Sequence, residues 1–147
     1  MSDQSPVGTR TPVITVPVEA GQLKFFAKAT GETNPVYTDE AAARETGYRA
    51  LPAPPTFLFS LNLARPDPFG AYVALGLDLG RILHAEQAFE YVAPICAGDT
   101  ITIEEVLTDV FEKKGGALSF YVFESVGTNQ HGEPVVRMKN TLVHRNG

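Results

Sequence analysis

The spacing of hydrophobic and polar positions along this chain changes near residue 82. Beyond that point apolar and polar residues tend to alternate, which is the two-residue period of half-buried strands. The alternation predicts four strands, separated by turns rich in glycine, proline and asparagine, over residues 83–91, 100–111, 117–128 and 134–145. An earlier strand is predicted over residues 13–18, where β-branched residues cluster.

The first half of the chain has the spacing of helices instead. Residues 19–30 place their apolar side chains on one broad face and precede Gly31, so we predict a helix that ends there. A smaller helix is predicted over residues 40–46, ahead of Gly47. The first twelve residues are polar and predict a flexible arm before a single domain at 13–147.

One segment between these helices and the strands is apolar on nearly every side. Residues 56–64 follow Pro54 and Pro55 and contain two phenylalanines and three leucines. A helix with no polar face is normally buried in the middle of a domain, and proline is compatible with its first turn. Residues 69–81 are apolar but contain three glycines, and their pattern assigns no element.

This order of elements predicts an α+β domain, with helices that cover one face of an antiparallel sheet. A long curved sheet wrapped around one central apolar helix is the hot-dog fold. Hot-dog domains usually pair through their sheets, so we expect a dimer.

Composition narrows the classes of partner. The chain has 147 residues and a net charge of -5, whereas a protein that binds nucleic acid needs a clustered basic surface. No apolar run reaches the ~20 residues of a membrane span. A single cysteine, Cys96, suits a reducing compartment, and the first residues lack a signal-peptide pattern. We therefore expect a cytoplasmic protein that binds neither nucleic acid nor membranes.

Cofactor motifs are not found in the sequence. Its three histidines and one cysteine have no metal-ligand spacing. Neither a glycine-rich phosphate loop nor a Gly-x-Ser-x-Gly elbow occurs. The sequence therefore predicts no cofactor and no metal.

The stretch from Gly31 to Phe57, GETNPVYTDEAAARETGYRALPAPPTF, carries a resemblance to a known family. It resembles the hydratase motif of MaoC-like proteins, the R-specific enoyl-CoA hydratases and 3-hydroxyacyl dehydratases. It is most similar to the MaoC-like N-terminal family, which includes acyl dehydratase subunits. The later HAEQAFEYVAPICAGDTITIEEV fits the same family, and the resemblance extends from Val13 to Arg145.

The resemblance implies an acyl-CoA or acyl-carrier-protein thioester as the substrate, and it places a site on this chain. Glu32 and Tyr37 stand at the positions of the two catalytic residues, which are Asp and His in active members. Five further residues are implied to bind substrate, namely Asn34, Pro55, Thr56, Phe57 and His84. In active members a backbone N–H near this turn steadies the thioester oxygen, but Pro54 and Pro55 have no N–H to donate.

These departures leave several hypotheses open. A tyrosine, with a pKa of ~10, exchanges protons poorly near pH 7. The chain is therefore predicted to be a substrate-binding subunit that needs a catalytic hot-dog partner, so the dimer would be a heterodimer. The alternatives are a homodimeric hydratase that uses Glu32 and Tyr37, and a non-catalytic thioester-binding protein. Glu32 and Asn34 could also serve only to order a turn.

Overall fold

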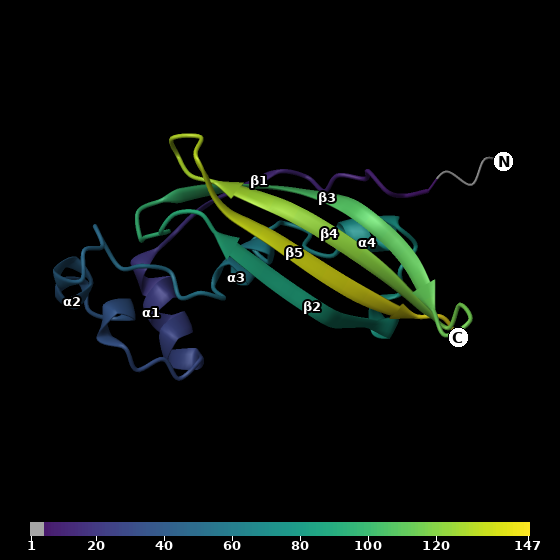
Figure 1. Cartoon of the computed structure of the whole chain (residues 1–147), viewed down its shortest axis with the longest axis horizontal. Helices are drawn as coiled ribbons and strands as arrows, with labels where there is room; N and C mark the ends of the chain where they lie inside the picture. Colours follow the sequence, from purple (N-terminus) through teal and green to yellow (C-terminus); the bar gives the residue numbers. More distant parts are fainter. Residues whose placement is uncertain (1–4) are drawn as a thin grey trace.

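One antiparallel sheet of five strands forms the body of the protein, and the computed structural model describes residues 5–147. The strands are β1 (Ile14–Pro17), β2 (Ile82–Tyr91), β3 (Thr100–Lys113), β4 (Leu118–Thr128) and β5 (Pro134–Arg145). Their order across the sheet is β1-β3-β4-β5-β2, which leaves β1 and β2 at the two edges. Figure 1 shows the sheet as a long, curved layer. The predicted α+β class is confirmed.

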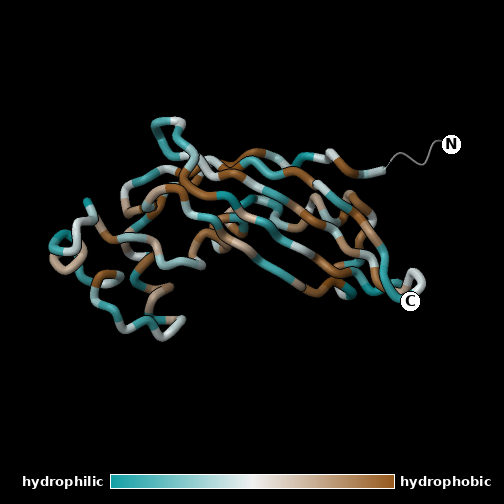
Figure 2. Tube along the Cα trace, viewed as in Figure 1, coloured by the Kyte–Doolittle hydropathy of each residue, from teal (hydrophilic) through white to brown (hydrophobic). Residues whose placement is uncertain are grey.

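Alternation along the strands gives the sheet one buried face. In β3 the residues Ile101, Ile103, Glu105 and Leu107 are all buried, and Figure 2 shows apolar and polar positions alternating along the long strands. The register shifts once in β2, after His84, and once in β3, after Leu107. Such bulges bend a strand and increase its twist, which accounts for part of the curvature.

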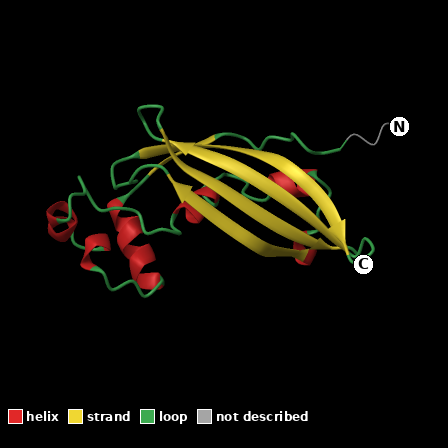
Figure 3. Cartoon of the chain, in the orientation of Figure 1, coloured by secondary structure: helices red, strands yellow, loops and turns green. Residues whose placement is uncertain are grey.

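Six short helical elements precede β2 in the chain. They are α1 (Ala20–Ala29), η1 (Pro35–Tyr37), α2 (Glu40–Glu45), α3 (Leu58–Asn62), α4 (Gly70–Ala74) and η2 (Leu79–Arg81). Figure 3 shows α1 and α2 beyond one end of the sheet and α3 and α4 along one of its faces. Gly31 and Gly47 have positive φ angles of 72° and 105°, so the predicted ends of the first two helices are confirmed.

The central apolar helix is shorter and less enclosed than the sequence predicts. We expected a helix over residues 56–64, but α3 has only five residues. Leu58 and Leu61 are buried, whereas Leu63 is 51% exposed. The prediction of burial on all sides was wrong because one side of this segment borders a cavity instead of packed side chains.

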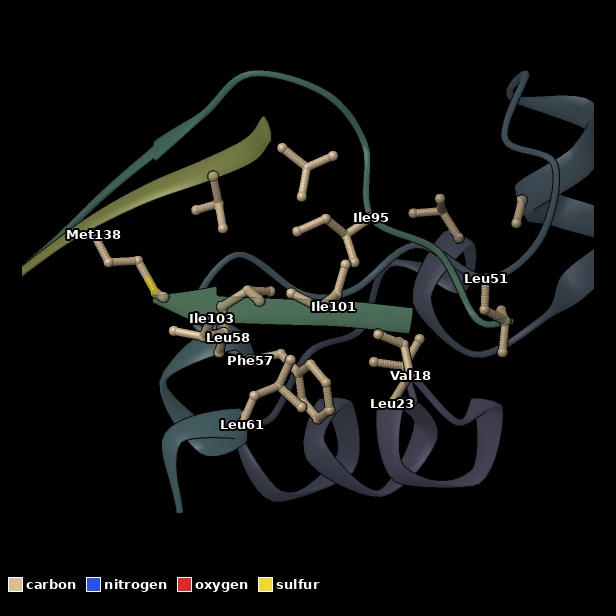
Figure 4. Packing of buried hydrophobic residues seen from close by; sticks show 14 residues of the cluster. Val18, Leu23, Leu51, Phe57, Leu58, Leu61, Ile95, Ile101, Ile103 and Met138 are labelled. Carbon is tan, nitrogen blue, oxygen red and sulfur yellow. The ribbon is translucent and has the colours of Figure 1, made fainter. Parts of the chain in front are cut away.

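The main core joins α1, α3 and the sheet. Figure 4 shows Phe57, Leu58 and Leu61 packed with Leu23 of α1 on one side of β3. Phe57 and Phe26 make an edge-to-face contact with ring centroids 5.5 Å apart. Burying each of these side chains contributes about 1.5–3 kcal/mol, so this contact region fixes the helices against the sheet.

The segment that the sequence pattern left unassigned forms α4 and η2. Tyr72 of α4 packs edge-to-face on Phe123 of β4, with centroids 5.4 Å apart. Leu75 joins this second cluster, which also includes Leu107 of β3 and Leu142 of β5. The segment therefore covers the end of the sheet that α3 does not reach.

The N-terminal arm differs in part from the expected flexible segment over residues 1–12. Thr11 donates its amide N–H to the Glu105 carbonyl, and Gly8 donates to the Leu107 carbonyl. An isolated bridge joins Arg10 to Val106. These backbone hydrogen bonds hold residues 8–11 along β3, while residues 1–4 lie outside the described part of the chain.

Candidate functional site

The loop after α1 uses its own polar side chains to form a turn. The Glu32 carboxylate accepts a hydrogen bond of 3.0 Å from the Asn34 amide N–H. The Asn34 side-chain oxygen accepts one of 3.1 Å from the Val36 amide, which caps η1. Both side chains therefore have the turn-forming role that the sequence left open.

Tyr37 ends η1 and is half-buried. Burial raises the pKa of its phenol, and the neighbouring Tyr48 and Glu32 raise it further. The phenol therefore keeps its proton at neutral pH, so Tyr37 can donate a hydrogen bond but is a poor base.

The proline turn before α3 is attached to the loop that follows β2. Ala53 donates its amide N–H to the Ile95 carbonyl at 2.7 Å, and Ala97 donates to the Leu51 carbonyl at 2.8 Å. The Tyr91 hydroxyl donates to the Pro55 carbonyl. These contacts hold Pro55 beside the end of β2.

A cavity of about 350 Å³ lies between these two loops. Three tyrosines line it, Tyr37, Tyr48 and Tyr91, together with Pro55 and the loop after β2. Burial, with a smaller contribution from Tyr37, raises the pKa of Tyr91 to about 12. At neutral pH the phenols of Tyr37 and Tyr91 therefore keep their protons and exchange them poorly.

A larger cavity of about 800 Å³ lies between α3, α4, the N-terminal arm and the sheet. Its exposed lining includes Leu63, Phe69 and Leu79, and His84 lies there with its ring stacked on Phe59 at 5.2 Å. A cavity of this size and apolar lining is typical of small-molecule sites.

The structure brings some predicted site residues together and separates others. Tyr37 and Pro55 line the small cavity, whereas His84 lines the large one. His84 and Tyr91 lie seven residues apart in β2, or roughly 23 Å in an extended strand. Thr56 is exposed, and Phe57 belongs to the core and lines neither cavity.

Sequence reasoning missed several residues that line the cavities. Tyr48 and Tyr91 come from distant parts of the chain, and only the fold brings them to Tyr37. Glu105 and Asn140, in contrast, carried a signal. Each occupies an inward position of an alternating strand that is otherwise apolar, and a polar residue there should have been noticed.

Residues 5–147 contain neither a metal-ligand cluster nor a membrane-spanning helix. No group of three or more His, Cys, Asp or Glu side chains in this range is placed to hold a metal ion. Among the helices described, none is long and apolar enough to cross a membrane.

Comparison with known proteins identifies the family. A family model described as "FAS1-like, dehydratase domain region" matches residues 5–138. The chain is also 41% identical to a UPF0336 protein of Streptomyces avermitilis over 110 residues, 74% of this chain and 73% of that protein. The chain belongs to the FAS1-like dehydratase family. The resemblance to MaoC-like dehydratases is thereby confirmed.

Solved structures agree with this family assignment. This chain is similar to a chain of the C-terminally truncated HadBC (3R-hydroxyacyl-ACP dehydratase) complex of Mycobacterium tuberculosis. Identity is 29% and the TM-score 0.79, over 95% of this chain and 98% of that one. A MaoC-like dehydratase superimposes with a TM-score of 0.85 at 25% identity, over 97% of this chain and 43% of that longer one. The predicted hot-dog fold is confirmed.

Proposed function

We propose that this chain is the substrate-binding subunit of a two-chain hot-dog enzyme. The enzyme would interconvert (R)-3-hydroxyacyl and enoyl thioesters carried by coenzyme A or acyl-carrier protein. The large cavity takes the acyl chain, and a second hot-dog chain supplies the acid and the base.

One observation carries this division of labour: the large cavity does not include either predicted catalytic residue. Glu32 and Tyr37 do not line it, and its only histidine is His84 at the exposed side. The lining has two carboxylates: Asp67 is exposed, and Glu105 lies on β3, which β4 and β5 separate from the strand of His84. Three strand spacings amount to about 14 Å, too far for Glu105 and His84 to act on adjacent carbon atoms.

The chemistry makes this separation important. In dehydration a base removes the proton on C2, an acid donates a proton to the departing 3-hydroxyl, and water leaves. Both groups must reach adjacent carbons and exchange protons near neutral pH. In this chain the Glu32 carboxylate is bound to the Asn34 amide, and the Tyr37 phenol has a raised pKa. A partner that carries a carboxylate and an imidazole would provide what this chain lacks.

The free edge of the sheet supports pairing with another subunit. Among the described strands, β2 pairs only with β5 and leaves its other edge open. An edge strand of ten residues is a ready template for a second sheet. The similar HadBC and ChsH1-ChsH2 structures of Mycobacterium tuberculosis are named as two-protein complexes.

The test compares the purified chain alone with the chain co-expressed with a MaoC-like protein that has an intact Gly-Asp-x-Asn-Pro-x-His motif. We expect only the pair to hydrate crotonyl-CoA and longer enoyl-CoA thioesters. The loss of enoyl absorbance measures this hydration. Glu32→Ala should leave most of that turnover, whereas substitution of the partner's motif Asp should abolish it. Turnover by this chain alone that Glu32→Ala abolishes would overturn the proposal. Thioester binding without hydration in any pairing would indicate a non-catalytic protein.

A self-sufficient homodimer is the second candidate, and one observation favours it. The Glu32 charge is close enough to Tyr37 to raise its pKa, so the two side chains are neighbours. This hypothesis predicts that Tyr37→Phe removes most turnover of the isolated chain while circular dichroism shows an unchanged fold.

A further inference from the structure

The large cavity has a mixed exposed side, where Arg10, Asp67 and His84 lie beside apolar residues, and a polar buried side. Its exposed side includes Leu63, Phe69 and Leu79, which are 51%, 46% and 45% exposed. Four polar or charged lining residues are instead at least nine-tenths buried, namely Thr11, Arg65, Glu105 and Asn140. We call these four residues the polar floor. A ligand that enters past the exposed residues meets the polar floor.

The polar floor has hydrogen-bonding atoms without partners. Among the described residues, Thr11 Oγ1, Arg65 Nη2 and Asn140 Oδ1 are buried and have no hydrogen-bond partner within 3.5 Å in good geometry. Thr11 nevertheless lies close enough to Glu105 to lower the pKa of its carboxyl, and Asn140 lies close enough to Tyr72 to lower the pKa of its phenol. Asn62 Oδ1, which also belongs to the cavity lining, is in the same condition. An unpaired buried polar atom costs about 1–3 kcal/mol, so several in one cavity indicate a missing partner.

Arg65 and Glu105 face this cavity without touching. Arg65 uses Nη1 to donate to the Pro12 carbonyl, which leaves Nη2 free. Within residues 5–147 no ion pair of 4.0 Å or less joins it to Glu105. Burial raises the pKa of Glu105, and Arg65 opposes that shift, so the two groups interact across a gap. A neutral polar group between them could form a hydrogen bond with each of the two side chains.

We propose that the polar floor binds a hydroxyl group on the ligand's otherwise apolar chain. The inference rests on the proposed function in that the ligand is an acyl thioester, and it adds that the preferred acyl chain is oxygenated. A hydroxyl donates and accepts at once, which suits the free amide oxygen of Asn140 and the free N–H of Arg65. A second carboxylate would instead be repelled by Glu105, and a plain alkyl chain would leave every free atom unpaired.

The register of the sheet indicates where along the acyl chain this hydroxyl lies. His84 of β2 is paired with Leu142 of β5, and both line the cavity. Asn140 lies two residues from Leu142 in β5, or about 7 Å along the strand. A hydroxyl bound at Asn140 therefore lies several carbon atoms from the part of the chain beside His84.

The experiment measures binding of octadecanoic acid and its mono-hydroxylated derivatives to the full chain, by displacement of a fluorescent fatty acid. A series with the hydroxyl at different carbons should show one preferred region, bound about tenfold more tightly than the unsubstituted acid. Asn140→Leu should remove this preference, because the variant loses more affinity for the hydroxylated acids than for the plain acid. Lys139→Leu, on the opposite face of the same strand, is the matched control and should keep the preference. Thr11→Val is the second variant if Asn140→Leu fails to fold.

The outcomes separate this inference from the proposed function. Equal binding of plain and hydroxylated acids would mean that the polar floor holds water only, which overturns the inference and leaves the proposed function standing. Binding of neither acid would overturn both. Selective binding of hydroxylated acids, with no turnover in any pairing, would support the inference and contradict the proposed function.

Discussion

Two buried acidic side chains, Asp99 and Glu105, differ in their hydrogen-bond partners. Asp99 directly precedes β3, and Glu105 lies six residues later, inside that strand. They are 1% and 7% exposed. One Asp99 oxygen accepts hydrogen bonds from Arg49 and the Cys96 amide, and the other accepts one from Gln130. Glu105 forms no ion pair within 4.0 Å in the described chain and borders the large cavity.

Their pKa values shift in opposite directions for this reason. Burial alone would raise the pKa of Asp99, but the hydrogen bonds from Arg49, Cys96 and Gln130 outweigh it and hold the pKa below its ordinary value. Burial raises the pKa of Glu105, and Arg65 does not compensate fully. The difference separates an acid that holds the fold together from one that borders the large cavity.

The largest expected effect is loss of the Asp99 anchor. Asp99→Ala removes three hydrogen bonds and leaves the buried Cys96 amide unpaired, so we expect the free energy of unfolding to fall by about 3 kcal/mol. Urea denaturation followed by circular dichroism measures this loss. Arg49→Gln is the control and should cost under about 1 kcal/mol, because the Arg49 side chain is 54% exposed. Equal losses in the two variants would contradict the anchor role.

Removing the cation of the polar floor should have the next largest effect. Arg65→Met loses the hydrogen bond to the Pro12 carbonyl and leaves Glu105 without a compensating charge, so we expect a loss of about 2 kcal/mol at pH 7. Denaturation at pH 4 should show a smaller loss, since protonated Glu105 needs no cation. A loss that is the same at both pH values would show that Arg65 acts only by packing.

Much of the fold follows from sequence periodicity, and these two acids show where that stops. The predicted and observed bounds of β5 coincide at residues 134 and 145, because apolar alternation and a turn delimit it. Asp99 lies in the Ala-Gly-Asp turn that supported the family resemblance. Its partner Arg49, however, lies 50 positions away and is brought to it only by tertiary structure.

The candidate site was predicted less completely than the fold. The motif located the loop that holds Glu32 and Tyr37, but it could not show that the large cavity lies elsewhere. That cavity exists because residues 56–64 form a short helix and α4 covers the far end of the sheet. Neither feature has a periodic signal, since the glycines around α4 interrupt the apolar pattern.

A smaller effect is expected from the charge of Asp99 alone. Because its folded pKa is lowered, its charge adds stability that is fully present above the unfolded pKa of about 4 and is lost as the pH falls through the folded value. Asp99→Asn should therefore be less stable than the wild type by roughly 1–2 kcal/mol at pH 7, and the two should converge once the pH falls below the folded pKa of Asp99. Thermal unfolding at a series of pH values tests this, and parallel curves would rule out a role for the charge.

The smallest change in the free energy of unfolding should come from Glu105→Gln, and this variant should gain stability where the others lose it. A folded pKa above the unfolded one means that the contribution of Glu105 is present below pH ~4 and lost as the pH rises through the folded value. At pH 7 the neutral Gln avoids the cost of a buried charge, so the variant should equal or exceed the wild type in stability, by at most about 1 kcal/mol. The same denaturation curves measure it, with Glu104→Gln, an exposed neighbour on the other face of β3, as control. If Glu105→Gln instead lost as much stability as Asp99→Ala, Glu105 would be a structural anchor. The polar floor would then be satisfied by contacts within the protein and would not need a ligand hydroxyl.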